Sequence, residues 1–364
     1  MLGRLLLVWR VLRRTFGFTF APLVVGFAFL SLRAGLAVAM ALDNVVFPSL
    51  RRARVRAPIV IVGNPRTGTT FLQRFLCDHD FGAGLQLFRM VYSSLLVQKL
   101  IAPIVPKLEA ISPARHHKTA AHDTDLQSVE TDDVSVLFRF FDGFFLYGFF
   151  LAHADDDPVA MFDPSVRDTS ARDFDWLEKL WRRSLAFTGK SRIVAKLFST
   201  GVRMQPFLDR FPDAKILYMA RDPVAVIPST MSLVTGVLDS ALGFWRLPEE
   251  KRRRYLDRLY LALVDLLRRF HDDWTSGKID RSRVYVVRYD RLMADFDGVM
   301  GEICAFVGHE PTEAQKAAIA KVAAKQRAYK SEHTYDLAKF GLDADRIRRD
   351  TAFFTETFLA KAAS

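Results

Sequence analysis

Cysteine is scarce in this chain, which has two, Cys77 and Cys304, among its 364 residues. Two thiols are too few for a disulfide framework or a cysteine-based zinc site, so we expect a reducing compartment. The sequence also lacks internal repeats and low-complexity linkers. With 50% hydrophobic residues and 31 Phe, the composition excludes a disordered or collagen-like chain and indicates a sizeable buried core.

Acidic residues are almost missing from the amino-terminal stretch. Residues 1–58 contain nine Arg and a single acid, Asp43, whereas the rest of the chain contains 43 basic and 40 acidic residues. The net charge of +11 is therefore concentrated at the amino terminus. Because a nucleic-acid-binding protein needs a basic surface across its folded body, we expect no nucleic-acid partner.

The same stretch contains an uncharged run of 18 residues, Thr15 to Leu32, followed by Arg33. This length is near the lower limit for a membrane-spanning helix, and Pro22 interrupts it. Arginine clusters flank both sides, without the charge asymmetry of a single-pass anchor. We interpret residues 1–57 as a helical hairpin or interfacial helix that meets anionic headgroups, with the body on the cytoplasmic side. A soluble arm that packs on the body is the alternative, and a membrane-spanning helix is the third interpretation.

Short apolar runs alternate with helical patterns after the arm. These runs are Ile59–Val62, Ile193–Lys196, Lys215–Ala220 and Val284–Val287. Continuous runs with β-branched residues are typical of buried parallel strands. The sequence therefore predicts an α/β fold with a mostly parallel sheet flanked by helices, as one domain over residues 58–364.

A glycine loop, Gly63-Asn64-Pro65-Arg66-Thr67-Gly68-Thr69-Thr70, follows the first predicted strand. Its glycines have the spacing of a phosphate-binding loop, but Thr69 stands where a triphosphate-binding loop has lysine. Backbone N–H groups, the hydroxyls of Thr69 and Thr70, and the Arg66 cation can still hold a shorter anion. A glycine turn without a ligand is the alternative.

A second candidate anion site follows the strand at 215–220. Arg221 stands at the carboxyl end of this strand, where open α/β sheets bind ligands, and Ser229 lies eight residues later. Convergence of Arg221 and Ser229 on one phosphate requires a bend near Pro223 or Pro228. A surface turn with a local ion pair is the alternative.

Taken together, Pro65-Arg66-Thr67-Gly68-Thr69-Thr70 and Arg221-Asp222-Pro223 with Ser229 resemble the sulfotransferases that depend on 3′-phosphoadenosine 5′-phosphosulfate (PAPS), in particular their bacterial branch. The similarity extends from about Pro58 to Phe358 and implies a P-loop-like sulfotransferase fold. It implies that the loop Pro65–Thr70 holds the 5′-phosphosulfate of PAPS, while Arg221 and Ser229 hold the 3′-phosphate. The implied reaction is a metal-independent, in-line transfer of a sulfuryl group to an acceptor hydroxyl.

The resemblance also suggests catalytic residues. Arg66 is expected to stabilise charge on the departing phosphate oxygen, assisted by Lys196 at a strand end. A general base must take the acceptor's proton, and the His that cytosolic relatives often place after this strand is missing here. Glu130 is our first choice for the base and His122 the second. Acids ahead of an apolar run are also typical of a helix amino terminus, so helix capping is the alternative for this segment.

The aromatic stretch Phe140–Phe150 is interpreted as core packing, with an apolar acceptor pocket for a lipid-like or polycyclic alcohol as the alternative. Two rival functions stay open. A P-loop kinase or NTPase would need a Mg²⁺-binding Asp after a strand, for which Asp290 is a loose candidate. A non-catalytic, membrane-associated scaffold with a nucleotide fold is the non-enzyme rival.

Overall fold

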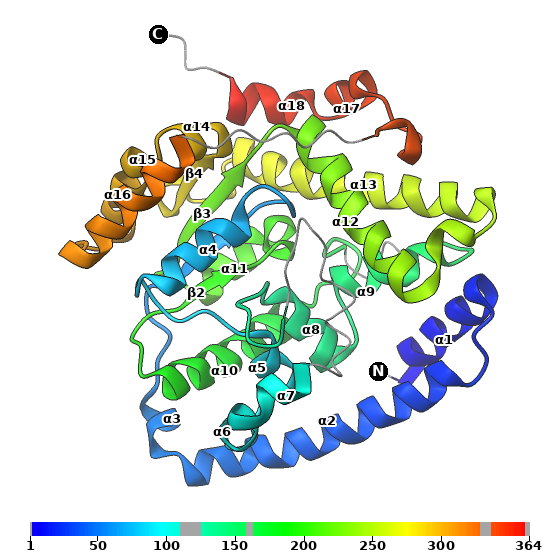
Figure 1. The fold of residues 1–364 in the computed structure, drawn as a ribbon, viewed down its shortest axis with the longest axis horizontal. Coiled ribbons are helices and arrows are strands. Elements are labelled where there is room, and N and C mark those ends of the chain that lie inside the picture. The colour runs from blue at the N-terminus through cyan, green and yellow to red at the C-terminus, as the bar shows by residue number, and fades with distance from the viewer. Residues whose placement is uncertain (1, 110–124, 158–162, 328–335, 361–364) are drawn as a thin grey trace. The chain divides into compact units, whose positions relative to one another are not determined.

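The computed structural model describes residues 2–109, 125–157, 163–327 and 336–360 (Figure 1). The chain divides into two compact units. The first comprises Met1–Val55, Gly84–Ser191 and Met231–Tyr260, and the second comprises Arg56–Ala83, Arg192–Thr230 and Leu261–Ser364. Nearly all of the expected arm, residues 1–57, thus belongs to the first unit together with two later segments.

A four-stranded parallel sheet organises the second unit. Its strands are β1 (Ile59–Val62), β2 (Val194–Lys196), β3 (Lys215–Ala220) and β4 (Val284–Arg288), in the order β2-β1-β3-β4. Ile61 lies opposite Lys196 on one side and Leu217 on the other. The predicted α/β fold with a parallel sheet is confirmed, and each predicted strand lies within one residue of its observed bounds.

Burial explains why these strands form. All four residues of β1 are buried, as the continuous apolar run predicts. Helices α4 (Thr69–Asp78), α15 (Phe296–Val307) and α16 (Glu313–Arg327) contribute to one hydrophobic cluster with Ile59, Ile61 and Leu217. Tyr218 instead stacks on Phe270 of α13 (Glu249–Thr275), with ring centroids 3.5 Å apart. Both faces of the sheet are thus covered by side chains. Loops follow the carboxyl ends of its strands.

The remaining helices complete the two units. Those of the first unit are α1 (Leu2–Phe16), α2 (Ala21–Val46), α3 (Pro48–Arg52), α5 (Leu87–Val91), α6 (Leu95–Ile101), α7 (Val105–Glu109), α8 (Asp133–Phe140), α9 (Phe144–Phe149) and α10 (Ser170–Thr188). The second unit also has α11 (Met204–Arg210), α14 (Tyr289–Ala294), α17 (Ala344–Asp350) and α18 (Ala352–Phe354). Two long helices, α12 (Pro223–Leu242) and α13 (Glu249–Thr275), contribute residues to both units.

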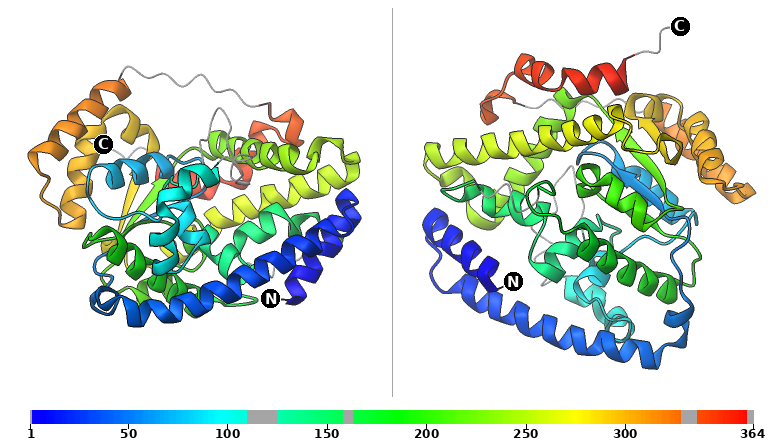
Figure 2. Two further views of the ribbon diagram at one scale, coloured as in Figure 1. Left: turned by 60° about the horizontal axis from the view of Figure 1, so that its bottom comes forward. Right: turned by 180° about the vertical axis from the view of Figure 1, so that it is seen from behind.

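The amino-terminal helices α1 and α2 form a hairpin, drawn in blue in Figure 2. Asp43 of α2 is fully buried and accepts hydrogen bonds from the Ser94 hydroxyl and the N–H groups of Leu95 and Leu96. It also pairs with Arg183 Nε of α10 at 2.8 Å. This single acid therefore fixes α2 to two other helices of its unit.

Most aromatic side chains of the stretch 140–150 are buried or half-buried, as core packing predicts. Tyr147 is 1% exposed. The neighbouring carboxylate of Asp142 is also buried and pairs with Arg167 at 2.6 Å and Arg172 at 2.9 Å.

Candidate anion-binding site at the sheet edge

The loop after β1 has an unusual backbone. Gly63, Arg66 and Gly68 have φ values of +142°, +71° and +93°. A Cβ atom on Gly63 would lie 2.8 Å from the Met219 carbonyl oxygen, so this position requires glycine. Because a backbone that changes hand within a turn forms concavities lined by N–H groups, the loop has the character of an anion cradle.

Side-chain hydrogen bonds hold this loop in place. The Thr67 hydroxyl donates to the Asn64 carbonyl at 2.7 Å, and Asn64 Nδ2 donates to the Leu263 carbonyl at 2.9 Å. From α12, the Thr230 hydroxyl donates to the Pro65 carbonyl at 3.0 Å. The loop conformation is therefore preorganised by the protein itself.

Helix α4 begins directly after the loop, with Gly68 as its N-cap and no side-chain cap. The first N–H groups of a helix have no partner within it and carry a partial positive charge, so this end favours an anion. The buried Lys196 side chain, 1% exposed, donates from Nζ to the Thr70 hydroxyl at 2.9 Å. The structure thus brings Lys196 and the loop together.

The second predicted segment meets the same loop. Arg66 Nε donates to Ser229 Oγ at 3.0 Å, and Arg221 Nη1 donates to the Arg66 carbonyl at 2.9 Å. Helix α12 continues through Pro228, and Arg66 contacts both Arg221 and Ser229. Convergence of Arg221 and Ser229 on one phosphate stays a prediction. The local ion pair expected for a simple surface turn does not account for these long-range contacts.

Tyr289, the first residue of α14, has no role in the site predicted from the sequence. The Arg221 guanidinium carbon lies 4.0 Å from the centroid of the Tyr289 ring. A Cβ on Gly68 would lie 2.9 Å from the same ring, so the ring closely approaches the start of α4. One feature of the sequence could have indicated this contact. Tyr289 is an aromatic residue at the carboxyl end of a predicted strand, and Arg221 stands at the carboxyl end of another, so both lie at the same edge of the sheet.

The proposed bases are placed differently. Glu130 belongs to the first unit, is 6% exposed, and donates its N–H to the Leu85 carbonyl. Helix α8 begins at Asp133 and its N-cap is Asp132, with no side-chain cap. Glu130 is therefore not the cap of this helix. His122 lies outside the described residues.

The rival Mg²⁺ ligand is already engaged. Asp290 is exposed, and its carboxylate pairs with the Arg288 guanidinium at 2.7 Å. That hydrogen bond, with smaller contributions including a backbone hydrogen bond from Arg291, lowers the pKa of Asp290 despite partial desolvation. Over the ranges that the structure describes, no group of three or more His, Cys, Asp or Glu side chains is arranged to hold a metal.

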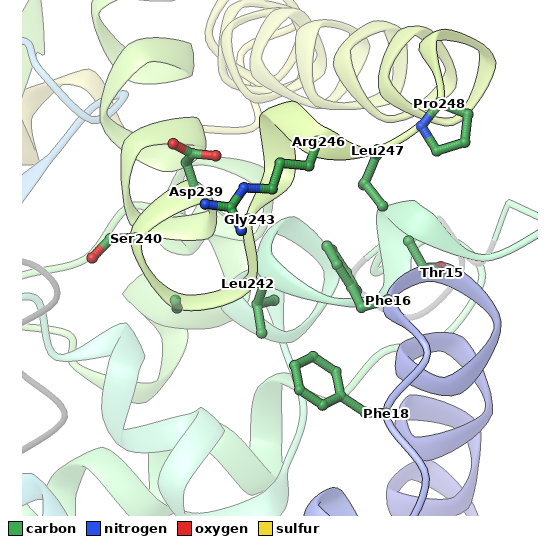
Figure 3. Close-up of a pocket in the computed structure, with 11 residues that line it drawn as sticks. Thr15, Phe16, Phe18, Asp239, Ser240, Leu242, Gly243, Arg246, Leu247 and Pro248 are labelled. Atoms are coloured by element: carbon green, nitrogen blue, oxygen red, sulfur yellow. The ribbon is translucent and has the colours of Figure 1, made fainter.

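The first unit contains a cavity of about 620 Å³. Phe16 and Phe18, at and beyond the end of α1, line it together with Leu242 from the end of α12 and Arg246 (Figure 3). Asp239 lies on the same rim as Arg246. The cavity therefore combines an aromatic wall with a polar rim.

Residues 58–313 match the sulfotransferase family. The omega-hydroxy-beta-dihydromenaquinone-9 sulfotransferase Stf3 of Mycobacterium bovis is 24% identical over 255 residues, which are 69% of this chain and 62% of Stf3. Stf3 of Mycobacterium tuberculosis gives the same values. The chain thus spans 62% of the length of these curated relatives.

Two solved structures share the fold. Sulfotransferase STF1 from Mycobacterium tuberculosis is 20% identical with a TM-score of 0.65, covering 96% of this chain and 90% of STF1. Sulfotransferase STF9 from Mycobacterium avium is 19% identical with a TM-score of 0.65, covering 86% of this chain and 80% of STF9. The family resemblance and the P-loop-like fold expected from the sequence are both confirmed.

Proposed function

The chain belongs to the sulfotransferase family, and we propose that it moves a sulfuryl group from PAPS to the hydroxyl of a lipid-like or otherwise hydrophobic acceptor. The observation that carries this proposal is the meeting of two anion-binding segments at Arg66, which contacts Ser229 through its side chain and Arg221 through its carbonyl. A donor with a phosphosulfate at one end and a phosphate at the other needs two adjacent anion sites.

The residues of the loop fit such a donor. The loop N–H groups and the hydroxyls of Thr69 and Thr70 would hold the phosphosulfate, because uncapped helix N–H groups and hydroxyls donate to anionic oxygens. Arg221 and Ser229 would hold the 3′-phosphate. A phosphosulfate has no β- and γ-phosphate, so the absence of a lysine at Thr69 is no obstacle.

In the proposed in-line reaction, the acceptor oxygen bonds to sulfur while the bond between sulfur and the phosphate oxygen breaks. Arg66 and Lys196 would stabilise the charge that collects on the departing oxygen. Lys196 is well suited because its ammonium is buried and held by Thr70, so it needs little reorganisation. Glu130 would accept the hydroxyl proton as general base.

Three features support a hydrophobic acceptor. The first is that Stf3 is named for a dihydromenaquinone acceptor. The second is that Phe16 and Phe18 line part of the cavity in the first unit and offer an aromatic wall to an apolar molecule. Helix α2 provides the third feature, because it is long and apolar enough to cross a membrane and only 6% of its most apolar window is buried.

We propose that α2 lies in the membrane interface rather than spanning the bilayer. Val25, Phe27 and Val45 are 67%, 72% and 71% exposed, whereas Asp43 of the same helix is buried against α10. A helix with one side on the protein and an apolar side exposed is typical of interfacial binding. Two cysteines among 364 residues are too few for a disulfide framework, which fits a body on the cytoplasmic side.

Sulfuryl transfer tests the proposal directly. The full chain is incubated with PAPS carrying labelled sulfur and a lipid extract, and the labelled product is identified. We expect label in an apolar hydroxyl compound, with transfer abolished in Arg66→Ala. Turnover of this kind would exclude a scaffold role, whereas an absence of transfer to any lipid or small-molecule hydroxyl would contradict the proposal.

The base is tested with Glu130→Gln, which should retain adenosine 3′,5′-bisphosphate binding and lose transfer. Glu313→Gln removes an acid whose side chain is 89% exposed and serves as the control. Undiminished turnover in Glu130→Gln would remove Glu130 from the mechanism.

A further inference from the structure

We propose that a cationic pocket beside α2 binds the phosphate of an anionic phospholipid headgroup. This inference deepens the proposed membrane contact of α2, and it involves none of the residues assigned to sulfuryl transfer. The pocket lies entirely within the first unit and has a volume of about 500 Å³.

Basic side chains outnumber acidic ones in the lining of this pocket. Five of its residues are basic and one is acidic: Arg139, Arg172, Lys179, Arg182, Arg183 and Asp175. They come from the end of α8 and from α10, and α2 supplies small and apolar residues opposite them. An excess of positive charge in a concave site selects an anion over a zwitterion.

Structural ion pairs account for only part of this charge. Arg183 pairs with Asp43 at 2.8 Å, and Arg172 pairs with Asp142 at 2.9 Å. Arg182 donates to the carbonyls of Leu50 and Ala53, which carry no net charge.

Arg139 and Lys179 are the two cations of the pocket whose side chains have neither a carboxylate nor a carbonyl partner among the residues that the structure describes. Arg139 lies over the Trp176 ring at 4.8 Å, and the Lys179 side chain is accessible from the pocket. Within the part of the chain that the structure describes, neither residue forms an ion pair with a carboxylate. Burial lowers the pKa of Arg139, which shows that holding this guanidinium without a counter-ion has a cost that an anion would relieve.

The pocket also borders an apolar surface suited to acyl chains. Ala37 and Ala41 line the pocket, and the next residues along α2, Val38 and Leu42, are 65% and 48% exposed. A phosphate held by Arg139 and Lys179 would leave its acyl chains beside this exposed side of α2. A free phosphate would use the cations but gain nothing from the apolar surface, so the arrangement favours a lipid.

Vesicle flotation with the full chain tests this site. Vesicles of phosphatidylcholine alone are compared with vesicles that also contain phosphatidylglycerol, for the wild type and for Arg139→Gln with Lys179→Gln. We expect phosphatidylglycerol to strengthen wild-type binding and the double variant to lose about 25-fold in affinity, roughly fivefold for each cation. A double variant that binds like the wild type would overturn the proposal.

A matched control removes the same charge elsewhere in the first unit. Lys107→Gln with Arg253→Gln removes two exposed cations outside the pocket and should change affinity less than about twofold, since distant exposed charges are screened. An equal loss in this control would show a diffuse charge effect and overturn a defined site. Thermal unfolding of each variant checks that it is folded. Lys179→Glu reverses the charge at this position and should weaken vesicle binding more than Lys179→Gln.

Inorganic phosphate separates a lipid from a free anion. Added phosphate should not displace the wild type from phosphatidylglycerol vesicles at matched ionic strength, and displacement would overturn the lipid assignment. Adenosine 3′,5′-bisphosphate binding is measured in parallel and should be unchanged in every pocket variant. Failure of the nucleotide to bind the wild type would instead contradict the proposed function.

Discussion

Arg66 Nε donates a hydrogen bond of 3.0 Å to Ser229 Oγ, although 163 positions separate the two residues in the chain. The carbonyl of the same arginine accepts from Arg221, so one residue links both candidate anion segments. Arg66 achieves this with a φ of +71°, a left-handed backbone that costs about 1–2 kcal/mol for a residue other than glycine. Strain held in place by several contacts is typical of functional loops.

Gly68→Ala should damage the loop. The added Cβ would lie 2.9 Å from the Tyr289 ring at a φ of +93°, so either the ring or the loop must move. We expect affinity for adenosine 3′,5′-bisphosphate to fall about tenfold and the free energy of unfolding to fall by about 1–3 kcal/mol. Calorimetry and urea denaturation measure the two effects.

Gly189→Ala is the matched control, because Gly189 also has a positive φ, +73°, but a Cβ there meets nothing within 4 Å. Gly189→Ala should lower the free energy of unfolding by about 1–2 kcal/mol, the strain of a left-handed backbone at a residue with a Cβ. It should leave nucleotide affinity unchanged. Equal nucleotide affinity in the two variants would show that the contact between Gly68 and Tyr289 does not shape the site.

Tyr289→Leu should weaken nucleotide binding more than Tyr289→Phe. The Arg221 guanidinium lies 4.0 Å from the Tyr289 ring centroid, and a cation–π contact of this kind contributes about 0.5–1 kcal/mol at an exposed site, a two- to fivefold change in affinity. Phenylalanine keeps the ring face and leucine does not. If calorimetry shows equal losses for both variants, the ring does not orient Arg221.

The sheet and the anion loops could be predicted from the sequence because both are local. Continuous β-branched runs produce buried parallel strands wherever helices cover both faces, and the glycine loop carries its own conformational signature. The sequence predicts that Arg221 and Ser229 converge on one phosphate, but the contacts of both residues with Arg66, 155 and 163 positions away, have no local signal. The stacking of Arg221 on Tyr289 depends on the packing of two strands and has no local signal.

The contacts of the amino-terminal arm, residues 1–57, could not be predicted from the sequence. Its apolar character is visible in the sequence, and packing on the body is one of the alternatives, but no pattern indicates which residues of the body the arm contacts. In the sequence Asp43 stands out only as the one acid of a basic stretch, whereas in the structure it is buried against Arg183, 140 residues away. A buried ion pair between distant segments depends on tertiary packing, which neither composition nor periodicity reports.

Asp43→Asn should destabilise the protein by about 3–5 kcal/mol, because Arg183 is left buried without its counter-ion. Urea denaturation measures the loss. Adding Arg183→Met to the same chain should recover part of it, since the uncompensated charge is then removed. Strictly additive effects of the two substitutions would contradict a coupled pair.

Stability should depend on pH through His153, which is 3% exposed. Burial, followed by the charges of Arg254 and Arg258, lowers the pKa of His153 to about 3. The unfolded chain binds this proton near pH 6.5, so acid favours unfolding, and this residue should remove about 1.4 kcal/mol of stability per pH unit between about pH 6 and pH 4.

His153→Phe isolates this contribution, because phenylalanine keeps the aromatic contact with Tyr255 without a titrating group. Urea denaturation across this pH range should show a steeper loss for the wild type than for the variant. Parallel curves would mean that His153 is not held neutral in the folded protein.

The most direct test of a PAPS site is calorimetry of adenosine 3′,5′-bisphosphate and of Mg·ATP on the full chain, each with the wild type and with Arg66→Ala. We predict that the wild type binds the bisphosphate in preference to Mg·ATP and that Arg66→Ala loses bisphosphate affinity while remaining folded. Selective binding of Mg·ATP, or bisphosphate binding that Arg66→Ala leaves intact, would contradict the account.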